Sequence, residues 1–192
     1  MLSEVPDGWL GTTVGGIVEL QNGFGFKSKD WAQDGLPIIR IQNLNGGGDF
    51  NYFNGEYDEK YLVQKGDLLF CWSGSRGTSF GARYWTQEKG LLNQHIFKCI
   101  PKEGVEKAFL YYLLDWMTVA IEKEAHGGAG LAHIKKSEMI AFSCCIPPVS
   151  EQRRIAKILS ELDNFIARQK SIVEQQTRTK RGLMDDLLTG RV

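Results

Sequence analysis

Hydrophobic and polar positions follow two different rhythms along this chain, and the change falls at Pro147 and Pro148. Up to Lys102, short apolar runs lie between glycine-rich or polar turns, which is the pattern of β-strands. The predicted strands cover residues 36–44, 66–74, 90–100 and, further on, 140–146. Residues 45–61 lack a clear pattern and are predicted to form a polar loop.

One segment within the first region has a helical period instead. In residues 105–125, apolar side chains recur at three- and four-residue steps and are predicted to face the core: Phe109, Leu113, Trp116, Met117, Ala120 and Ile121. Together with the strands, this helix predicts an α+β domain that is mainly β.

A long helix is predicted after the two prolines. Proline cannot continue a strand ladder or a helix, and Ser150 is predicted to cap the first turn. Apolar residues then recur at heptad steps: Ile155, Leu159, Leu162, Ile166, Val173, Leu183 and Leu187. The polar residues Gln169, Gln176 and Lys180 interrupt this seam.

Two interpretations of the helix are open. It could be an ordinary C-terminal helix that packs partly on its own domain. At 1.5 Å per residue it reaches roughly 57 Å, whereas a domain of about 148 residues has a radius of gyration near 15 Å. The length therefore favours a coiled coil between chains, in which polar seam positions fix the register. We predict a globular domain over residues 1–148 and a dimerisation helix over residues 149–192.

Composition narrows the class of protein. Hydrophobic residues make up 42% of the 192 residues, which is enough for a packed core. The sequence has neither a signal-peptide pattern nor an apolar run of membrane-spanning length, so no membrane partner and a cytoplasmic location are expected. Cys71, Cys99, Cys144 and Cys145 have no metal-ligand spacing and are predicted to be reduced, buried strand residues.

Net charge alone does not indicate a nucleic-acid partner, because it is zero. The charge is distributed unevenly, with −3 on residues 1–148 and +3 on residues 149–192. DNA affinity would therefore have to come from local clusters, or from a partner that supplies more basic surface.

Motifs for catalysis are missing from the sequence. The loop at residues 73–83 lacks the Gly-Lys-Ser/Thr of a phosphate-binding loop, and no serine lies in a Gly-x-Ser-x-Gly elbow. His95, His126 and His133 have no metal-ligand spacing, so neither a catalytic nor a metal site is predicted. A metal-dependent nuclease with a non-obvious site remains a separate hypothesis.

Three loop stretches have the chemistry of a recognition surface: residues 22–31, 73–83 and 127–137. Their glycines permit close approach of the backbone to a partner, and their lysines, arginines and hydroxyls can donate to phosphates or bases. The candidate DNA contacts are Lys27, Ser28, Arg76, Thr78, Arg83, Gln94, Lys135 and Lys136. Each loop alone could equally be an ordinary polar surface loop.

Taken together, these stretches resemble the specificity (S) subunits of Type I restriction–modification systems over nearly the whole chain. The resemblance rests on "VPDGWLGTTVGGIVEL", "NGFGFKSKDW", "VQKGDLLFCWSGSRGTSFGA", "LLNQHIFKC" and "HGGAGLAHIKKSEM". The most specific stretch is "IPPVSEQRRIAKILSELDNFI", which continues to "KRGLMDDLLTGRV".

The resemblance implies a target recognition domain followed by a spacer helix, in a subunit that performs no chemistry. Partner methyltransferase (M) subunits would bind S-adenosylmethionine and methylate adenine, and a motor–nuclease (R) subunit could join for cleavage. Such subunits usually contain two modules whose helices pair antiparallel, and each module reads one half of an interrupted DNA target.

This chain has one module only, and could be a natural half-subunit or an excised C-terminal module. In either case we expect a second copy to supply the missing helix, and the dimer to read a palindromic target with an unspecified gap. The alternative from a different class is a coiled-coil interaction protein whose loops bind protein rather than DNA.

Overall fold

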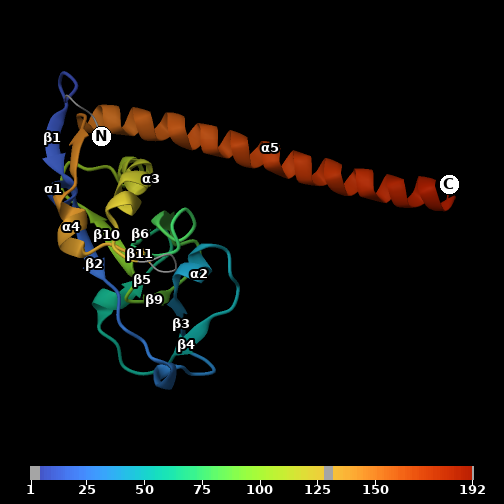
Figure 1. Ribbon diagram of the computed structural model, residues 1–192, viewed down its shortest axis with the longest axis horizontal. Helices are drawn as coiled ribbons and strands as arrows, with labels where there is room; N and C mark the ends of the chain where they lie inside the picture. The colour runs from blue at the N-terminus through green and yellow to red at the C-terminus, as the bar shows by residue number, and fades with distance from the viewer. Residues whose placement is uncertain (1–4, 128–131, 192) are drawn as a thin grey trace. The chain divides into compact units, whose positions relative to one another are not determined.

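The computed structural model describes residues 5–127 and 132–191, and Figure 1 shows their arrangement. The chain divides into two compact units, Met1–Arg153 and Arg154–Val192. The first unit is mainly β with several helices. The second consists of the greater part of helix α5 (Val149–Thr189), which is 41 residues long. The predicted α+β class with a long C-terminal helix is confirmed.

Two four-stranded sheets form the centre of the first unit. One has the order β2-β10-β6-β8 and is antiparallel throughout, whereas the other has the order β4-β3-β9-β5 with β3 and β9 parallel. Their strands are β2 (Val18–Asn22), β10 (Ile96–Pro101), β6 (Leu68–Cys71), β8 (Gly81–Tyr84), β4 (Asn51–Phe53), β3 (Leu36–Ile39), β9 (Gly90–Leu92) and β5 (Leu62–Val63). Two smaller sheets pair β1 (Leu10–Thr13) with β12 (Ser143–Ile146), and β7 (Ser73–Gly74) with β11 (Ala132–His133).

A hydrophobic cluster joins the two large sheets. Leu69, Cys71 and Ile96 come from the first sheet, and Ile39 and Leu92 from the second. All five are at most 1% exposed, so the two sheets pack against each other here. The short helices α1 (Val14–Ile17) and α4 (Lys136–Ala141) pack against each other (Figure 1).

Helix α3 (Lys107–Glu124) covers the β6–β8 side of the first sheet. Its buried residues are Phe109, Leu110, Leu114, Met117 and Ile121. The predicted core face was therefore displaced: Leu113 is half-buried and Trp116 is 59% exposed, while Leu110 and Leu114 take the inward positions. Apolar residues lie on nearly all sides of this helix, so the sequence is compatible with several buried faces. The face that is buried is the one that packs against the sheet.

The strand predicted for residues 36–44 is only half correct. The strand β3 ends at Ile39, and the short helix α2 (Ile41–Leu44) follows. The amide of Arg40 donates to Asn43 Oδ1 at 3.0 Å, and the Asn43 side-chain amide donates to the carbonyls of Gly47 and Asp49. This buried asparagine turns the chain and ends the strand.

Residues 90–100 likewise form two strands rather than one. The Ile96 amide donates to the Asn93 carbonyl, and the Gln94 amide to Asn93 Oδ1. The resulting turn carries the chain from β9 in one sheet to β10 in the other.

Two further predictions needed correction. Residues 140–146 were predicted as one strand, but α4 continues to Ala141 before β12 begins at Ser143. The predicted polar loop 45–61 contains β4 and the 3-10 turn η2 (Glu59–Tyr61). Pairing with β3 orders β4, and such long-range pairing leaves little trace in local sequence.

Helix α5 begins at Val149, so Ser150 is not its cap. The carbonyl of Pro148 accepts from the amides of Glu151 and Gln152 at 2.9 and 3.0 Å. Gln152 is 1% exposed, and its side chain joins the start of α5 to the turn before α3. Its Nε2 donates to the carbonyls of Gly104 and Pro147, and its Oε1 accepts from the Glu106 amide.

All four cysteine thiols are free and lie in strands, but only Cys71, Cys99 and Cys145 are buried, so the prediction is wrong for the burial of Cys144. Burial raises the pKa of Cys71 to about 12, and that of the half-buried Cys144 to about 11. Within residues 5–127 and 132–191 there is no helix long and apolar enough to cross a membrane. The same residues contain no cluster of three or more metal-ligating side chains.

Candidate nucleic-acid interface

Polar stretches that are far apart in sequence are joined by direct contacts in the first unit. Residues 22–31 lie against the turn at residues 93–95. The amide of Phe24 donates to the Leu92 carbonyl at 2.8 Å, and Phe24 forms an isolated bridge with Asn93. A Cβ on Gly23 would lie 2.1 Å from the Asn93 carbonyl oxygen. Only glycine permits this approach, so Gly23 allows the first loop to pack closely against the turn at residues 93–95.

The turn at residues 93–95 also contacts the two other predicted loops, at residues 73–83 and 127–137. The rings of His95 and Trp72 lie 5.5 Å apart, and the Trp72 amide donates to the His95 carbonyl. Directly after Trp72, β7 pairs with β11, and the Ile134 amide donates to the Trp72 carbonyl. The three predicted loops are thus linked through Trp72 and His95.

Lys27 and Ser28 are exposed at the start of the 3-10 turn η1 (Ser28–Asp30). Asp30 Oδ2 accepts from the Lys27 amide at 2.7 Å, which fixes the backbone of the loop. This hydrogen bond orders the backbone that carries the Lys27 side chain and the Ser28 hydroxyl, and both groups can donate to phosphate.

Arg76 has a structural role in this chain. Its Nη2 donates to the Ala125 carbonyl at 2.6 Å and its Nη1 to the Glu122 carbonyl, both at the C-terminal end of α3. Arginine is well suited to this position, because the last carbonyls of a helix lack partners within the helix and carry partial negative charge. Glu122 Oε1 also accepts from the Gly77 amide at 2.9 Å. The loop at residues 75–79 is therefore fastened to α3 by two side chains.

Thr78 and Arg83 lie at different places in the unit. The Thr78 carbonyl accepts from Asn45 Nδ2, and its hydroxyl donates to Ser75 within the loop. Arg83 lies on the edge strand β8, where its Nη1 donates to the Ala82 carbonyl near Thr118 of α3. Thr78 is thus part of the joined loops, whereas Arg83 lies beside helix α3.

Gln94 and His95 occupy the exposed turn between β9 and β10. Gln94 Oε1 lies beside Gly25, and Gln94 Nε2 is 3.3 Å from His95 Nε2. Partial burial lowers the pKa of His95, and the charge of nearby His133 lowers it further. The imidazole is therefore neutral near pH 7 and able to accept a hydrogen bond. No periodic pattern in the sequence indicated that His95 connects these loops.

The third loop carries Lys135 and Lys136, which are exposed at the start of α4. Glu138 Oε2 accepts from the Lys135 amide, and Glu138 Oε1 lies 2.9 Å from His126 Nε2. The hydrogen bond from Lys135 and then that from His126 lower the pKa of Glu138. Residues 128–131 of the predicted loop lie outside the described residues.

Exposed aromatic rings near the first loop were not among the predicted site residues. Phe24 and Trp31 are 43% and 41% exposed, and the Arg40 guanidinium lies 4.5 Å from the centre of the Trp31 ring. Aromatic rings stack on bases and also favour protein interfaces. Their position inside a loop rich in glycine and lysine was the available signal.

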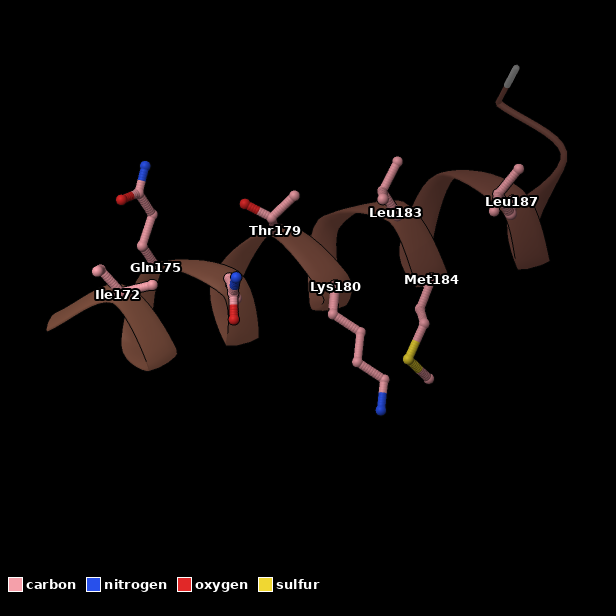
Figure 2. A pocket seen from close by; sticks show the side chains of 8 residues that line it. Ile172, Gln175, Thr179, Lys180, Leu183, Met184 and Leu187 are labelled. Atoms are coloured by element: carbon pink, nitrogen blue, oxygen red, sulfur yellow. The ribbon is translucent and has the colours of Figure 1, made fainter. Parts of the chain in front are cut away.

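The predicted dimerisation residues lie on α5. Leu162, Ile166, Val173, Leu183 and Leu187 are 48–65% exposed, and Ile155 and Leu159 are half-buried. Figure 2 shows part of this surface, where Thr179 and Leu183 project from one flank of a shallow groove and Lys180 and Met184 from the other.

Comparison with known proteins identifies the family. The profile described as "Type I restriction modification DNA specificity domain" matches residues 6–175. The chain belongs to this family. The Type I restriction enzyme EcoBI specificity subunit of Escherichia coli is 28% identical over 198 residues, covering 100% of this chain and 41% of that protein. The putative Type I restriction enzyme MjaX specificity subunit of Methanocaldococcus jannaschii is 34% identical, covering 98% of this chain and 47% of that protein.

Solved structures of specificity subunits share the fold of this family member. The HsdS subunit from Thermoanaerobacter tengcongensis matches 86% of this chain and 40% of its own, with a TM-score of 0.64 and 19% identity. A chain from a study of complex assembly and conformational transition in the type I R-M system matches 93% of this chain and 44% of its own, with a TM-score of 0.71 and 19% identity. The chain spans less than half the length of these relatives.

Proposed function

We propose that this chain is a non-catalytic DNA-recognition module of a Type I restriction–modification complex, and that it reads one half of a bipartite target. The observation that carries the proposal is the joining of residues 22–31, 73–79, 93–95 and 132–136 through Trp72 and His95, in a member of the specificity-domain family. Separate loops on one support can follow a DNA groove and its flanking phosphates together.

Six of the candidate residues take direct roles in this proposal. Lys27, Lys135 and Lys136 bind phosphates, and Ser28, Thr78 and Gln94 donate to phosphates or base edges. Arg76 acts as a positioning residue, because the carbonyls at the end of α3 already occupy its guanidinium. Arg83 stays a predicted DNA contact.

The proposed partners follow from the family. Methyltransferase subunits supply S-adenosylmethionine and the adenine-methylating site, and a motor–nuclease subunit joins for cleavage. The chain itself holds no cofactor. We place its action on DNA in the cytoplasm, and propose that α5 pairs antiparallel with α5 of a second copy.

The proposal is tested by sequencing modified bases in DNA from cells that co-express this chain with its methyltransferase subunit. A new methylated-adenine motif, absent from cells with the methyltransferase alone, is expected. A palindromic, interrupted motif would support the symmetric dimer, whereas an asymmetric motif would mean that a different module supplies the second half. A soluble complex that methylates no motif would favour the alternative, in which the loops bind protein.

A further inference from the structure

Arg40 lies where three of the joined loops meet. It follows directly after β3, and the carbonyl of the preceding residue, Ile39, accepts from the amide of Asn93 at 3.2 Å. The strands β3 and β9 are parallel neighbours, with Ile39 level with Leu92. Arg40 and the turn at residues 93–95 therefore leave the sheet at the same edge, next to each other.

The segment after Arg40 contacts the second loop. Helix α2 follows, and the Asn45 side-chain amide at its end donates to the Thr78 carbonyl at 3.1 Å. The main chain of Arg40 is fixed at the start of α2, where its amide donates to Asn43 Oδ1 and its carbonyl accepts from the Asn43 amide, both at 3.0 Å. The Arg40 side chain therefore extends from an ordered backbone.

The guanidinium of Arg40 contacts the first loop through an aromatic ring. It lies over the Trp31 ring, 4.5 Å from the ring centre. Trp31 ends the turn that carries Ser28, and its amide donates to the Ser28 carbonyl at 3.3 Å. Attraction between the cation and the indole face, which is stronger for Trp than for other rings, holds the guanidinium in this position.

The hydrogen-bond donors of this guanidinium are not used within the protein. Among the residues that the structure describes, its three nitrogens have no hydrogen-bond or ion-pair partner. Nε is buried and Arg40 as a whole is half-buried, so the Nη end is the part that a ligand can reach. Arg76 differs, because its Nη1 and Nη2 both donate to carbonyls of α3 and the residue after it.

We infer that Arg40 is a base-reading residue, which binds a guanine in the half-site through Nη1 and Nη2 while Trp31 positions its guanidinium. The half-site is the half of the bipartite target that one chain reads. This inference rests on the DNA recognition proposed above, and adds to it one base of the target and the residue that selects it.

The identity of the base follows from the shape of the guanidinium. Guanine presents two neighbouring acceptors, O6 and N7, in the major groove, and the planar fork of an arginine can donate to both. The other three bases have a donor or a methyl group where one of these acceptors would be. A good bidentate pair corresponds to about a 5- to 150-fold preference for guanine.

A phosphate is the alternative ligand for an arginine. A phosphate needs a positive charge, which a lysine supplies as a point charge, and the joined loops already carry Lys27, Lys135 and Lys136. Guanine needs the planar fork, which lysine lacks. Contact with the Trp31 ring restricts the orientation of that fork, and this restriction favours an acceptor pair with a fixed direction.

The test uses the full chain in complex with its methyltransferase subunit, and compares methylated motifs by modified-base sequencing. With Arg40→Lys, the motif of the unsubstituted chain is expected to persist except at one guanine, where other bases are now accepted, because lysine keeps the charge but not the fork. Arg153→Lys is the matched control. Arg153 lies outside the joined loops, and a lysine can keep its 2.6 Å ion pair with Glu106, so the motif should not change.

A second measurement does not depend on the folding of a variant. Replacing the selected guanine by 7-deazaguanine in a DNA duplex removes the N7 acceptor and leaves base pairing intact. The unsubstituted complex should bind this duplex at least about fivefold more weakly in fluorescence anisotropy. The Arg40→Ala complex should bind both duplexes equally, because it lacks the donor to N7.

The outcomes separate this assignment from DNA recognition itself. A half-site without a G·C pair, a guanine that Arg40→Lys still selects, or equal binding of both duplexes by the unsubstituted complex would overturn the assignment and leave DNA recognition standing. Unchanged guanine preference in Trp31→Ala would overturn the positioning role of the ring. A complex that methylates no motif would overturn both the assignment and the proposed function.

Discussion

At the scale of single residues, the main reassignment concerns Arg76. An arginine in a glycine–serine loop has the chemistry to bind guanine or phosphate, and the sequence supports that hypothesis. The structure gives its guanidinium two carbonyl partners, at Glu122 and Ala125. The same side chain thus fastens the loop that carries Thr78.

We expect Arg76→Ala to weaken DNA binding through loss of loop order. Its removal leaves helix-end carbonyls without their donors, so the free energy of unfolding should also fall by about 1–2 kcal/mol. Thermal denaturation and DNA titrations at two salt concentrations measure both effects.

Glu122→Ala is the matched control, because Glu122 holds the same loop through the Gly77 amide. If Arg76 positions the loop, both variants should lose affinity. If Arg76 contacts DNA directly, Glu122→Ala should keep or gain affinity, since it removes a negative charge.

At the scale of elements, single side chains set the boundaries of strands and helices. Asn43 ends β3, and Asn93 separates β9 from β10. Gln152 has the equivalent role for α5, since one buried amide side chain satisfies the Gly104 and Pro147 carbonyls and the Glu106 amide. This explains why a glutamine is buried at the start of the helix.

Gln152→Leu should lower the free energy of unfolding of the first unit by about 2–4 kcal/mol, because it leaves buried backbone groups unpaired. Urea denaturation followed by circular dichroism measures the change. Glu151→Leu, at the neighbouring and more accessible position, should lower stability by no more than about 1 kcal/mol, because it removes only a first-turn carboxylate that interacts with the helix dipole. Equal effects of the two variants would contradict the role assigned to Gln152.

At the scale of the whole molecule, a chain of zero net charge must bind DNA through local basic groups. Three exposed lysines per chain, Lys27, Lys135 and Lys136, give six phosphate contacts in the proposed dimer. Counterion release then predicts a slope of roughly −5 in log affinity against log salt concentration.

The double variant Lys135→Gln/Lys136→Gln should reduce the magnitude of that slope by roughly 3.5, because four charges leave the dimer. Fluorescence anisotropy on one DNA duplex across a salt series measures it. Lys65→Gln is the control, since Lys65 lies outside the joined loops and pairs loosely with Glu88 at 3.8 Å. An unchanged slope in the double variant would remove these two lysines from the interface.

The sequence alone determined the class of the domain, the long C-terminal helix and the burial of Cys71, Cys99 and Cys145. Each of these depends on local periodicity or on breaks such as Pro147 and Pro148, which are readable from neighbouring residues. The loops with recognition chemistry were also visible, because glycine and lysine composition is local.

Only the tertiary structure decided how these pieces connect. Strand β4 forms because β3 lies beside it, and α3 buries Leu110 and Leu114 because the sheet covers that side. Trp72 and His95 join loops that lie anywhere between residue 22 and residue 136. The role of Arg76 was hidden for the same reason, since its partners lie 46 and 49 residues away. Contacts between distant residues depend on the packed fold, and local sequence pattern carries no record of them.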